Sequence, residues 1–250
     1  MELLTDDELA LLAAALSPRA SAPHAALALC ACCHAFRAAL RATTRTLRTR
    51  YETLRALCRK FAVAHPTHLV ASKLLVCRAL DFAAPDCDAL ADAFGEGLRC
   101  LQLLSLNHSL LGDEGVATLV GRLPRDALPA LQLLYLERVE VGDAGAVALG
   151  GALARGAMPL LQSLHLANNR FGCVGMVAMA PALRTHPLLY KLDVRGNWIG
   201  GEGIEALASP ADGVLSTLRR LDVSHNPYGL RGLAALRALL LIRPALSLLA

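Results

Sequence analysis

The chain has 250 residues, of which 55% are hydrophobic and 18% are charged, and its formal net charge is +4. This apolar content can fill a core and excludes disorder over the whole chain, and 8 cysteines are too few for a small secreted disulfide scaffold of this length. We therefore expect one large domain or two small ones in a reducing compartment, the cytoplasm or the nucleus.

The first forty residues predict two helices. Thr5 is a candidate N-cap with Glu8 three residues later, and apolar residues then recur at helical spacing as far as Leu16, before a Ser-Pro-Arg turn at 17–19. A second apolar run covers residues 25–40. Charged residues interrupt even the most apolar part of the chain, residues 232–250, so we expect no membrane span.

This N-terminal segment resembles the F-box. The resemblance rests on the acidic LTDDEL opening, the Ser-Pro-Arg turn and Cys33-x-x-Phe36-Arg37, where the family usually has Cys-x-x-Trp-Arg. It implies binding to the Skp adaptor and through it to the cullin of a ubiquitin ligase. The residues that it marks as adaptor contacts or their supporting core are Leu4, Leu9, Leu12, Leu27 and Phe36.

The cluster Cys30-Ala31-Cys32-Cys33-His34 has the residue types of a metal site. Structural zinc takes four ligands, usually as two pairs, and no second pair follows here because Cys58 stands alone. We interpret the cluster as buried thiols and predict no metal and no cofactor.

Residues 37–60 predict a basic amphipathic helix, with eight arginine or lysine residues against one glutamate. A solvated face is the simplest interpretation of the basic stripe. An acidic partner, an anionic membrane surface and a nucleic-acid backbone are the alternatives, and the lack of interleaved aromatic residues disfavours nucleic acid. We place the end of the helical module at residue 66.

Five later segments share one template, with starts 28 to 30 residues apart. Apolar residues occupy template positions 1, 4, 6 and 11, and glycines occupy positions 12 and 15. The alternation predicts a short strand, and helical spacing after the second glycine predicts a helix. We expect the first glycine to adopt unusual backbone angles and the second to let the helix approach its strand. The segments begin at Leu101, Leu131, Leu161, Leu189 and Leu218.

Both ends of the array carry partial copies. A weaker copy places Leu75, Leu90 and Phe94 in apolar slots upstream, and a terminal strand begins at Leu246. The template resembles the leucine-rich repeat of ribonuclease inhibitor and the NOD-like receptors. The resemblance implies an α/β fold: a right-handed β-α superhelix, or horseshoe solenoid, of about six repeats plus a terminal strand over residues 67–250, preceded by a small all-α module over 1–66.

Position 9 of the template holds Asn169, Asn197 and Asn226, whose amides we expect to hydrogen-bond turn backbone groups. Positions 3, 5, 7 and 8 are expected to face solvent on the concave strand side and to contact a protein partner. The residues chosen for that contact are Tyr135, Glu137, Arg138, His165, Asn168, Lys191, Asp193, Arg195, Arg220, Asp222 and His225.

The resemblance implies a binding scaffold and no enzyme, although Asp222, Ser224 and His225 are the residue types of a hydrolytic triad. Our leading hypothesis is a substrate-recognition adaptor of a cullin-RING (SCF-type) ubiquitin ligase, with the target on the concave face. The alternative is a leucine-rich repeat inhibitor or sensor module, similar to ribonuclease inhibitor or NOD-like receptors and unrelated to ubiquitin.

Overall fold

The computed structural model describes residues 73–76, 86–88, 90–91, 94, 98–121, 123–209 and 215–250. The chain divides into two units, Met1–Ala56 and Leu57–Ala250, and every described residue belongs to the second. The F-box-like module, the cysteine cluster, the basic helix and the predicted boundary at residue 66 all lie outside the described residues.

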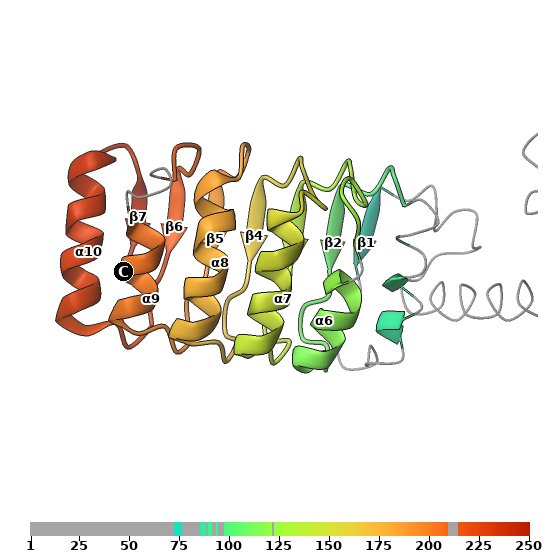
Figure 1. Cartoon of the computed structure of the whole chain (residues 1–250), viewed down its shortest axis with the longest axis horizontal. Helices are drawn as coiled ribbons and strands as arrows, with labels where there is room; N and C mark the ends of the chain where they lie inside the picture. The colour runs from blue at the N-terminus through green and yellow to red at the C-terminus, as the bar shows by residue number, and fades with distance from the viewer. Residues whose placement is uncertain are drawn as a thin grey trace, which may run out of the picture. The chain divides into compact units, whose positions relative to one another are not determined.

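Seven short strands form one parallel sheet in chain order (Figure 1). The strands pair residue for residue, so that Leu104 lies opposite Leu75 on one side and Leu134 on the other. The weaker upstream copy and the terminal strand are therefore both part of the array. The strands are β1 (Leu74–Val76), β2 (Leu103–Ser105), β3 (Leu133–Tyr135), β4 (Ser163–His165), β5 (Lys191–Asp193), β6 (Arg220–Asp222) and β7 (Ser247–Leu249).

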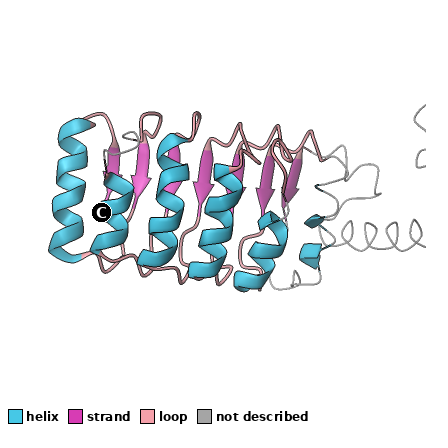
Figure 2. Ribbon diagram, viewed as in Figure 1, coloured by secondary structure: helices cyan, strands magenta, loops and turns pink. Residues whose placement is uncertain are grey.

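Helices alternate with the strands and line up on one side of the sheet (Figures 1 and 2). Because a helix is about 10 Å wide and neighbouring strands are about 4.8 Å apart, such a stack curves with its strands inside. We call the sheet face opposite the helices the strand face. No helix in the described ranges is long and apolar enough to cross a membrane. The helices are α6 (Gly112–Gly121), α7 (Asp143–Ala154), α8 (Cys173–Thr185), α9 (Gly201–Ala208) and α10 (Gly229–Ile242).

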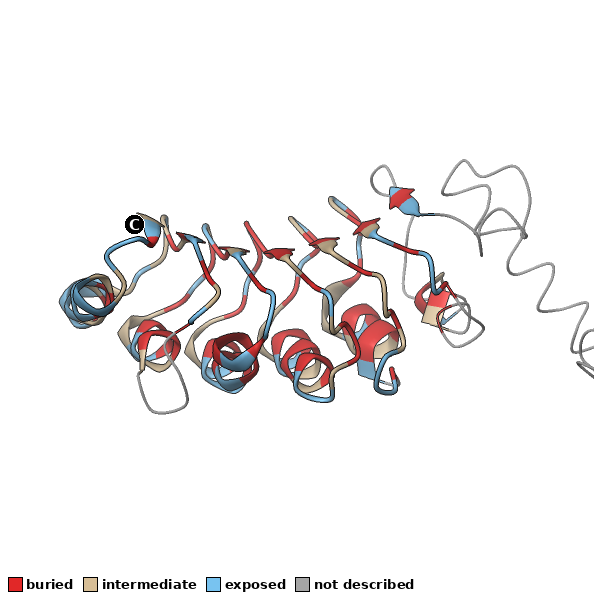
Figure 3. Cartoon of the chain, turned by 90° about the horizontal axis from the view of Figure 1, so that it is seen from above, coloured by how far each residue is buried: buried red, intermediate tan, exposed pale blue. Residues whose placement is uncertain are grey.

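The core lies between the sheet and the helices, where buried residues of successive repeats form a continuous layer (Figure 3). The side chains at template positions 1, 4 and 6 are at most 3% exposed in all five copies. Position 11 is buried as well, except at Tyr228, the most polar residue of that column. The predicted α/β solenoid and its register are thus confirmed.

Asn169 joins two repeats through four backbone hydrogen bonds. Its amide nitrogen donates to the carbonyl oxygens of Leu136 (2.7 Å) and Leu166 (3.0 Å), and its Oδ1 accepts from the backbone N–H groups of Val139 (3.0 Å) and Val141 (3.2 Å). Three of these groups belong to the preceding repeat, which has a valine where this one has asparagine. One buried amide therefore satisfies the turn backbone of its neighbour as well as its own.

The first-turn aspartates also act between repeats. The Oδ1 atom of Asp113 in α6 accepts hydrogen bonds from the backbone N–H groups of Gly142 (2.7 Å) and Gly145 (2.8 Å), at the start of α7. Asp143 makes the equivalent two bonds at the start of α8. Each carboxylate therefore caps the helix of the following repeat, where unpaired N–H groups and the helix dipole favour a negative charge.

The template glycines serve packing more than backbone freedom. At position 12, Gly112 and Gly229 have φ of +60° and +57°, but the prediction of unusual angles is wrong for Gly142, Gly172 and Gly200, whose φ values are negative. At position 15, a Cβ added to Gly175 would lie 2.8 Å from the Cβ of Ala146 in α7. At Gly175 the second glycine thus lets neighbouring helices approach each other, whereas at Gly232 the nearest atoms belong to Tyr228 of the same repeat.

We predict that Asn169→Ala destabilises the fold more than Asn197→Ala. The amide nitrogen of Asn197 donates to Leu166 and Val194 oxygens (both 2.9 Å), but its Oδ1 has no hydrogen-bond partner among the described residues. Asn197→Ala should therefore lower the free energy of unfolding by about 1 to 3 kcal/mol. Asn169→Ala should lower it by about 1 to 3 kcal/mol more, because it also leaves two buried N–H donors without an acceptor. Urea unfolding of both variants measures the difference; equal losses would contradict the assigned bonding.

We also predict that Cys173→Asp stabilises the fold. Cys173 occupies in α8 the place that Asp143 holds in α7, and its Sγ lies 2.9 Å from the position of a Cβ built on Gly200, at the start of α9. A carboxylate there can accept the N–H groups that cap α9, a gain of about 1 kcal/mol. Thermal unfolding checks this, with Cys173→Ala as the control; a lower melting temperature for the aspartate variant would argue against the interrepeat cap.

Candidate functional site

The strand register aligns one polar column along the strand face. The last residues of five successive strands lie opposite one another, and the ring of Tyr135 stacks on the ring of His165, with centroids 4.4 Å apart and an interplanar angle of 25°. Since parallel strands repeat every 4.8 Å or so, large side chains in such a column necessarily touch. The column is Ser105, Tyr135, His165, Asp193 and Asp222.

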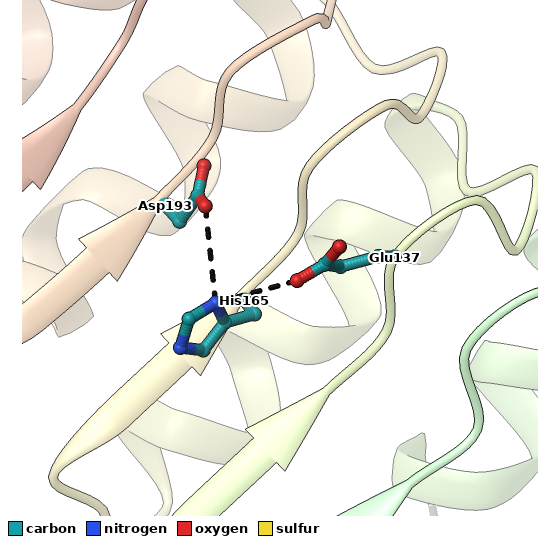
Figure 4. A group of neighbouring side chains, drawn as sticks. All are labelled: Glu137, His165 and Asp193. Carbon is teal, nitrogen blue, oxygen red and sulfur yellow. Dashed lines mark ion pairs between the residues drawn. The ribbon is translucent and has the colours of Figure 1, made fainter. Parts of the chain in front are cut away.

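His165 is the centre of this column. Its Nδ1 lies 3.4 Å from Oε1 of Glu137 and 3.8 Å from Oδ2 of Asp193, and the three side chains converge from neighbouring repeats (Figure 4). Its other ring nitrogen, Nε2, lies 3.0 Å from Oγ of Ser163 on the same strand. The hydroxyl therefore orients the ring so that Nδ1 faces both carboxylates.

Burial dominates the electrostatics of the centre. It lowers the pKa of His165 to about 4, helped by the positive charges of Lys191 and Arg195. The imidazole is therefore neutral at neutral pH. Burial also raises the pKa of Asp193, an effect that the backbone N–H and the guanidinium of Arg195 partly oppose.

Arg195 covers the column from the solvent side. Its Nε lies 3.6 Å from Oδ2 of Asp193, its Nη1 lies 4.0 Å from Oδ2 of Asp222, and its backbone N–H donates to Oδ1 of Asp193 (3.2 Å). With its side chain 45% exposed, the guanidinium bridges two carboxylates while remaining available to a ligand.

The expectation that every chosen residue faces solvent is wrong for part of the set. His165 and Asp193 are only 6% and 5% exposed, because side chains on adjacent strands cover one another. Tyr135, Glu137, Lys191 and Asp222 are half-buried. The exposed members are Arg138, Asn168, Arg195, Arg220 and His225.

The three residues with the letters of a triad are arranged differently. The hydroxyl of Ser224 donates to Oδ1 of Asp222 at 2.6 Å, and no hydrogen bond joins Ser224 to His225 in the described part of the chain. A serine nucleophile needs its histidine base within hydrogen-bond reach. This group therefore stabilises the strand end and has no nucleophile–base contact.

The structure adds two features to the sequence analysis, which had missed only the second. Trp198, in the turn after β5, is 70% exposed, although its large apolar side chain is of a kind that cores also hold. The donor atoms of Glu137, His165 and Asp193 all lie within 4.8 Å of one another, an arrangement with the residue types of a metal site. The signal for this second feature was the register, which puts the three on consecutive repeats; the prediction of no metal considered only the cysteine cluster.

Comparison with known proteins agrees with this architecture. The family model of the leucine-rich repeat matches residues 157–180, 185–208 and 214–236. The chain thus contains leucine-rich repeats in a solenoid. A search of curated proteins finds no match.

Two solved structures are among the matches. One is leiomodin-1 actin-binding site 2, with 18% identity, a TM-score of 0.47 and coverage of 62% of this chain and 86% of that one. The other is an internalin from Listeria monocytogenes, with 17% identity, a TM-score of 0.29 and coverage of 65% and 49%. At these identities the likeness concerns the fold alone.

Proposed function

We propose that this chain is a non-catalytic protein-binding protein that holds its partner on the strand face. The observation that carries the proposal is a row of residues directly after the strands that share one backbone conformation, four of them with exposed polar side chains, beside a buried polar network. A surface that is rigid before binding loses little conformational entropy when a partner docks.

The row owes its rigidity to the backbone. Template position 8, directly after each strand, has a left-handed conformation in all five copies, with φ between 54° and 64°. Glycine adopts it freely, and asparagine, aspartate and histidine adopt it more often than other residues, so an arginine there costs about 1 kcal/mol. Keeping such side chains at a cost to stability favours a role in binding over a role in folding. The row is His108, Arg138, Asn168, Gly196 and His225.

The exposed charge of the strand face is mostly positive. Arg138, Arg195 and Arg220 are exposed, whereas Asp193 is buried. Arginine is enriched at the energetic centres of protein interfaces, and so is tryptophan, which the exposed Trp198 supplies in the same repeat as Arg195. We therefore infer a protein partner with an acidic contact surface.

The finer form of the proposal is a substrate-recognition adaptor of an SCF-type ubiquitin ligase. In this scheme the segment around Leu9 and Phe36 would hold the Skp adaptor and thereby the cullin, and the strand face would hold the target. Its support is the F-box-like sequence pattern followed by a repeat solenoid.

The alternative is an inhibitor or sensor module without a link to ubiquitin, of the type found in ribonuclease inhibitor or NOD-like receptors. Its support is the repeat length of 28 to 30 residues, which is typical of those proteins. Both schemes place the partner on the strand face and differ only in the task of the first 66 residues.

We expect the double variant Arg195→Glu with Arg220→Glu to weaken partner binding about tenfold or more without unfolding the solenoid. Quantitative mass spectrometry of proteins captured from cell extract by immobilised wild type and variant measures the loss. The matched control is Arg125→Glu with Arg237→Glu, which makes the same change in net charge at two exposed residues outside the strands. If both double variants retain every partner of the wild type, the binding face lies elsewhere.

The adaptor role predicts that wild type recovers the Skp adaptor and cullin from cell extract and that Leu9→Asp with Phe36→Asp loses both. Charged side chains at these positions would disrupt an apolar adaptor contact. Circular dichroism of the variant must show the intact solenoid. If wild type recovers no adaptor, the adaptor role is wrong and the inhibitor or sensor module remains. Partner binding on the strand face is tested separately, by the arginine variants.

A further inference from the structure

We propose that Glu137, His165 and Asp193 bind a divalent cation of the zinc class, through Oε1, Nδ1 and Oδ2 respectively. This site is independent of the partner proposed above, since it is defined by side chains of this chain alone. It makes the strand face a metal site as well as a docking surface.

The spacing of the three donor atoms suits a shared ion. Nδ1 of His165 lies 3.4 Å from Oε1 of Glu137 and 3.8 Å from Oδ2 of Asp193, and all three atoms lie within 4.8 Å. Ligands about 2.0 to 2.2 Å from a tetrahedral zinc ion are roughly 3.4 Å from one another. Hydrogen bonds between these atoms would require about 2.7 to 3.2 Å. The distance from Nδ1 to Oε1 thus matches the spacing of two zinc ligands, whereas Oδ2 of Asp193 lies slightly beyond that spacing and must move closer when the ion binds.

The scaffold holds the three ligands in place. The backbone N–H of Leu136 donates to the carbonyl oxygen of His165 (2.9 Å), and the backbone N–H of Leu166 donates to the carbonyl oxygen of Asp193 (2.7 Å). Backbone hydrogen bonds therefore join the three repeats next to the site. Behind the ring, the hydroxyl of Ser163 lies 3.0 Å from Nε2. Outer partners of this kind fix the orientation of a ligating imidazole and leave its other nitrogen free for the ion.

Charge also permits the site. The carboxylates of Glu137 and Asp193 offset the two positive charges of the ion. The positive charges of Lys191 and Arg195 act against its binding. Arg195, whose Nε lies 3.6 Å from Oδ2 of Asp193, must turn away when the ion binds. It can do so because its side chain is 45% exposed and already lies 4.0 Å from a second carboxylate, that of Asp222.

The ligand set selects the class of ion. One imidazole and two carboxylates suit zinc and its neighbours in the first transition series, whereas calcium and magnesium prefer oxygen ligands alone. Three protein ligands leave a fourth position open. Because the side chain of Glu137 is 22% exposed, that position is open to water or to a donor atom of a bound protein.

The test is a zinc titration of the full chain after removal of metal with a chelator. Wild type should bind one equivalent that Glu137→Gln, His165→Gln and Asp193→Asn each bind more than about 100-fold less tightly, and Ser163→Ala about 10- to 100-fold less tightly. The matched control is Glu140→Gln, which removes an exposed carboxylate from the same repeat as Glu137 but outside the trio and should retain the site.

The absorption spectrum of bound cobalt distinguishes metal at this site from metal bound by any of the 8 cysteines of the chain. Cobalt bound by nitrogen and oxygen gives visible bands alone, whereas cobalt bound by thiolate adds a charge-transfer band in the near ultraviolet. The visible bands without a thiolate band should appear in wild type and Glu140→Gln and disappear in the three ligand variants.

Thermal unfolding with and without zinc guards against misfolded variants. Zinc bound to the folded state should raise the melting temperature of wild type and Glu140→Gln but not of the folded ligand variants. Equal zinc affinity in wild type and all three ligand variants would overturn the proposal. So would cobalt spectra in which every bound ion shows thiolate ligation.

Discussion

The structure depends on hydrogen bonds that each repeat makes to its neighbour. A single strand and helix cannot satisfy the backbone at the strand-to-helix turn or cap the first turn of the helix. Asn169 supplies the preceding repeat with two acceptor bonds and one donor bond, and Asp113 supplies the following helix with two acceptor bonds. Side chains thus reach in both directions along the array, and stability depends on the contacts between repeats as much as on the repeats themselves.

The same repetition that stabilises the array shapes its binding surface. Residue-for-residue pairing places equivalent side chains side by side, so a polar column forms wherever one template position is polar in successive copies. His165 and Asp193 are buried because they lie against each other, and because Tyr135 packs on His165 and Arg195 lies against Asp193. The strand face consequently has a buried polar network, which contains His165 and Asp193, and exposed arginine side chains that a partner can contact.

Sequence reasoning predicted the fold well because the apolar template is local. Leu104 and its equivalents at template position 4 needed only the alternation of one segment to be assigned to the core. The contacts between repeats were not predictable in the same way, since nothing within its own segment tells that Asp113 caps α7 or that Gly142 makes room for that carboxylate. The burial of His165 was missed for the same reason: exposure on a sheet is set by neighbours about 30 residues away.

Cys173 and Val139 show what happens where the pattern between repeats breaks. Cys173 replaces the capping carboxylate, and Val139 replaces the turn asparagine, yet the strand register continues through both repeats. The apolar core therefore tolerates the loss of single polar links. In the polar column, by contrast, His165 and Asp193 contact charged or aromatic side chains of neighbouring repeats. Substitutions in the column should change the chemistry of the strand face before they change the fold, which makes that face the part of the array where function can diverge at the smallest cost in stability.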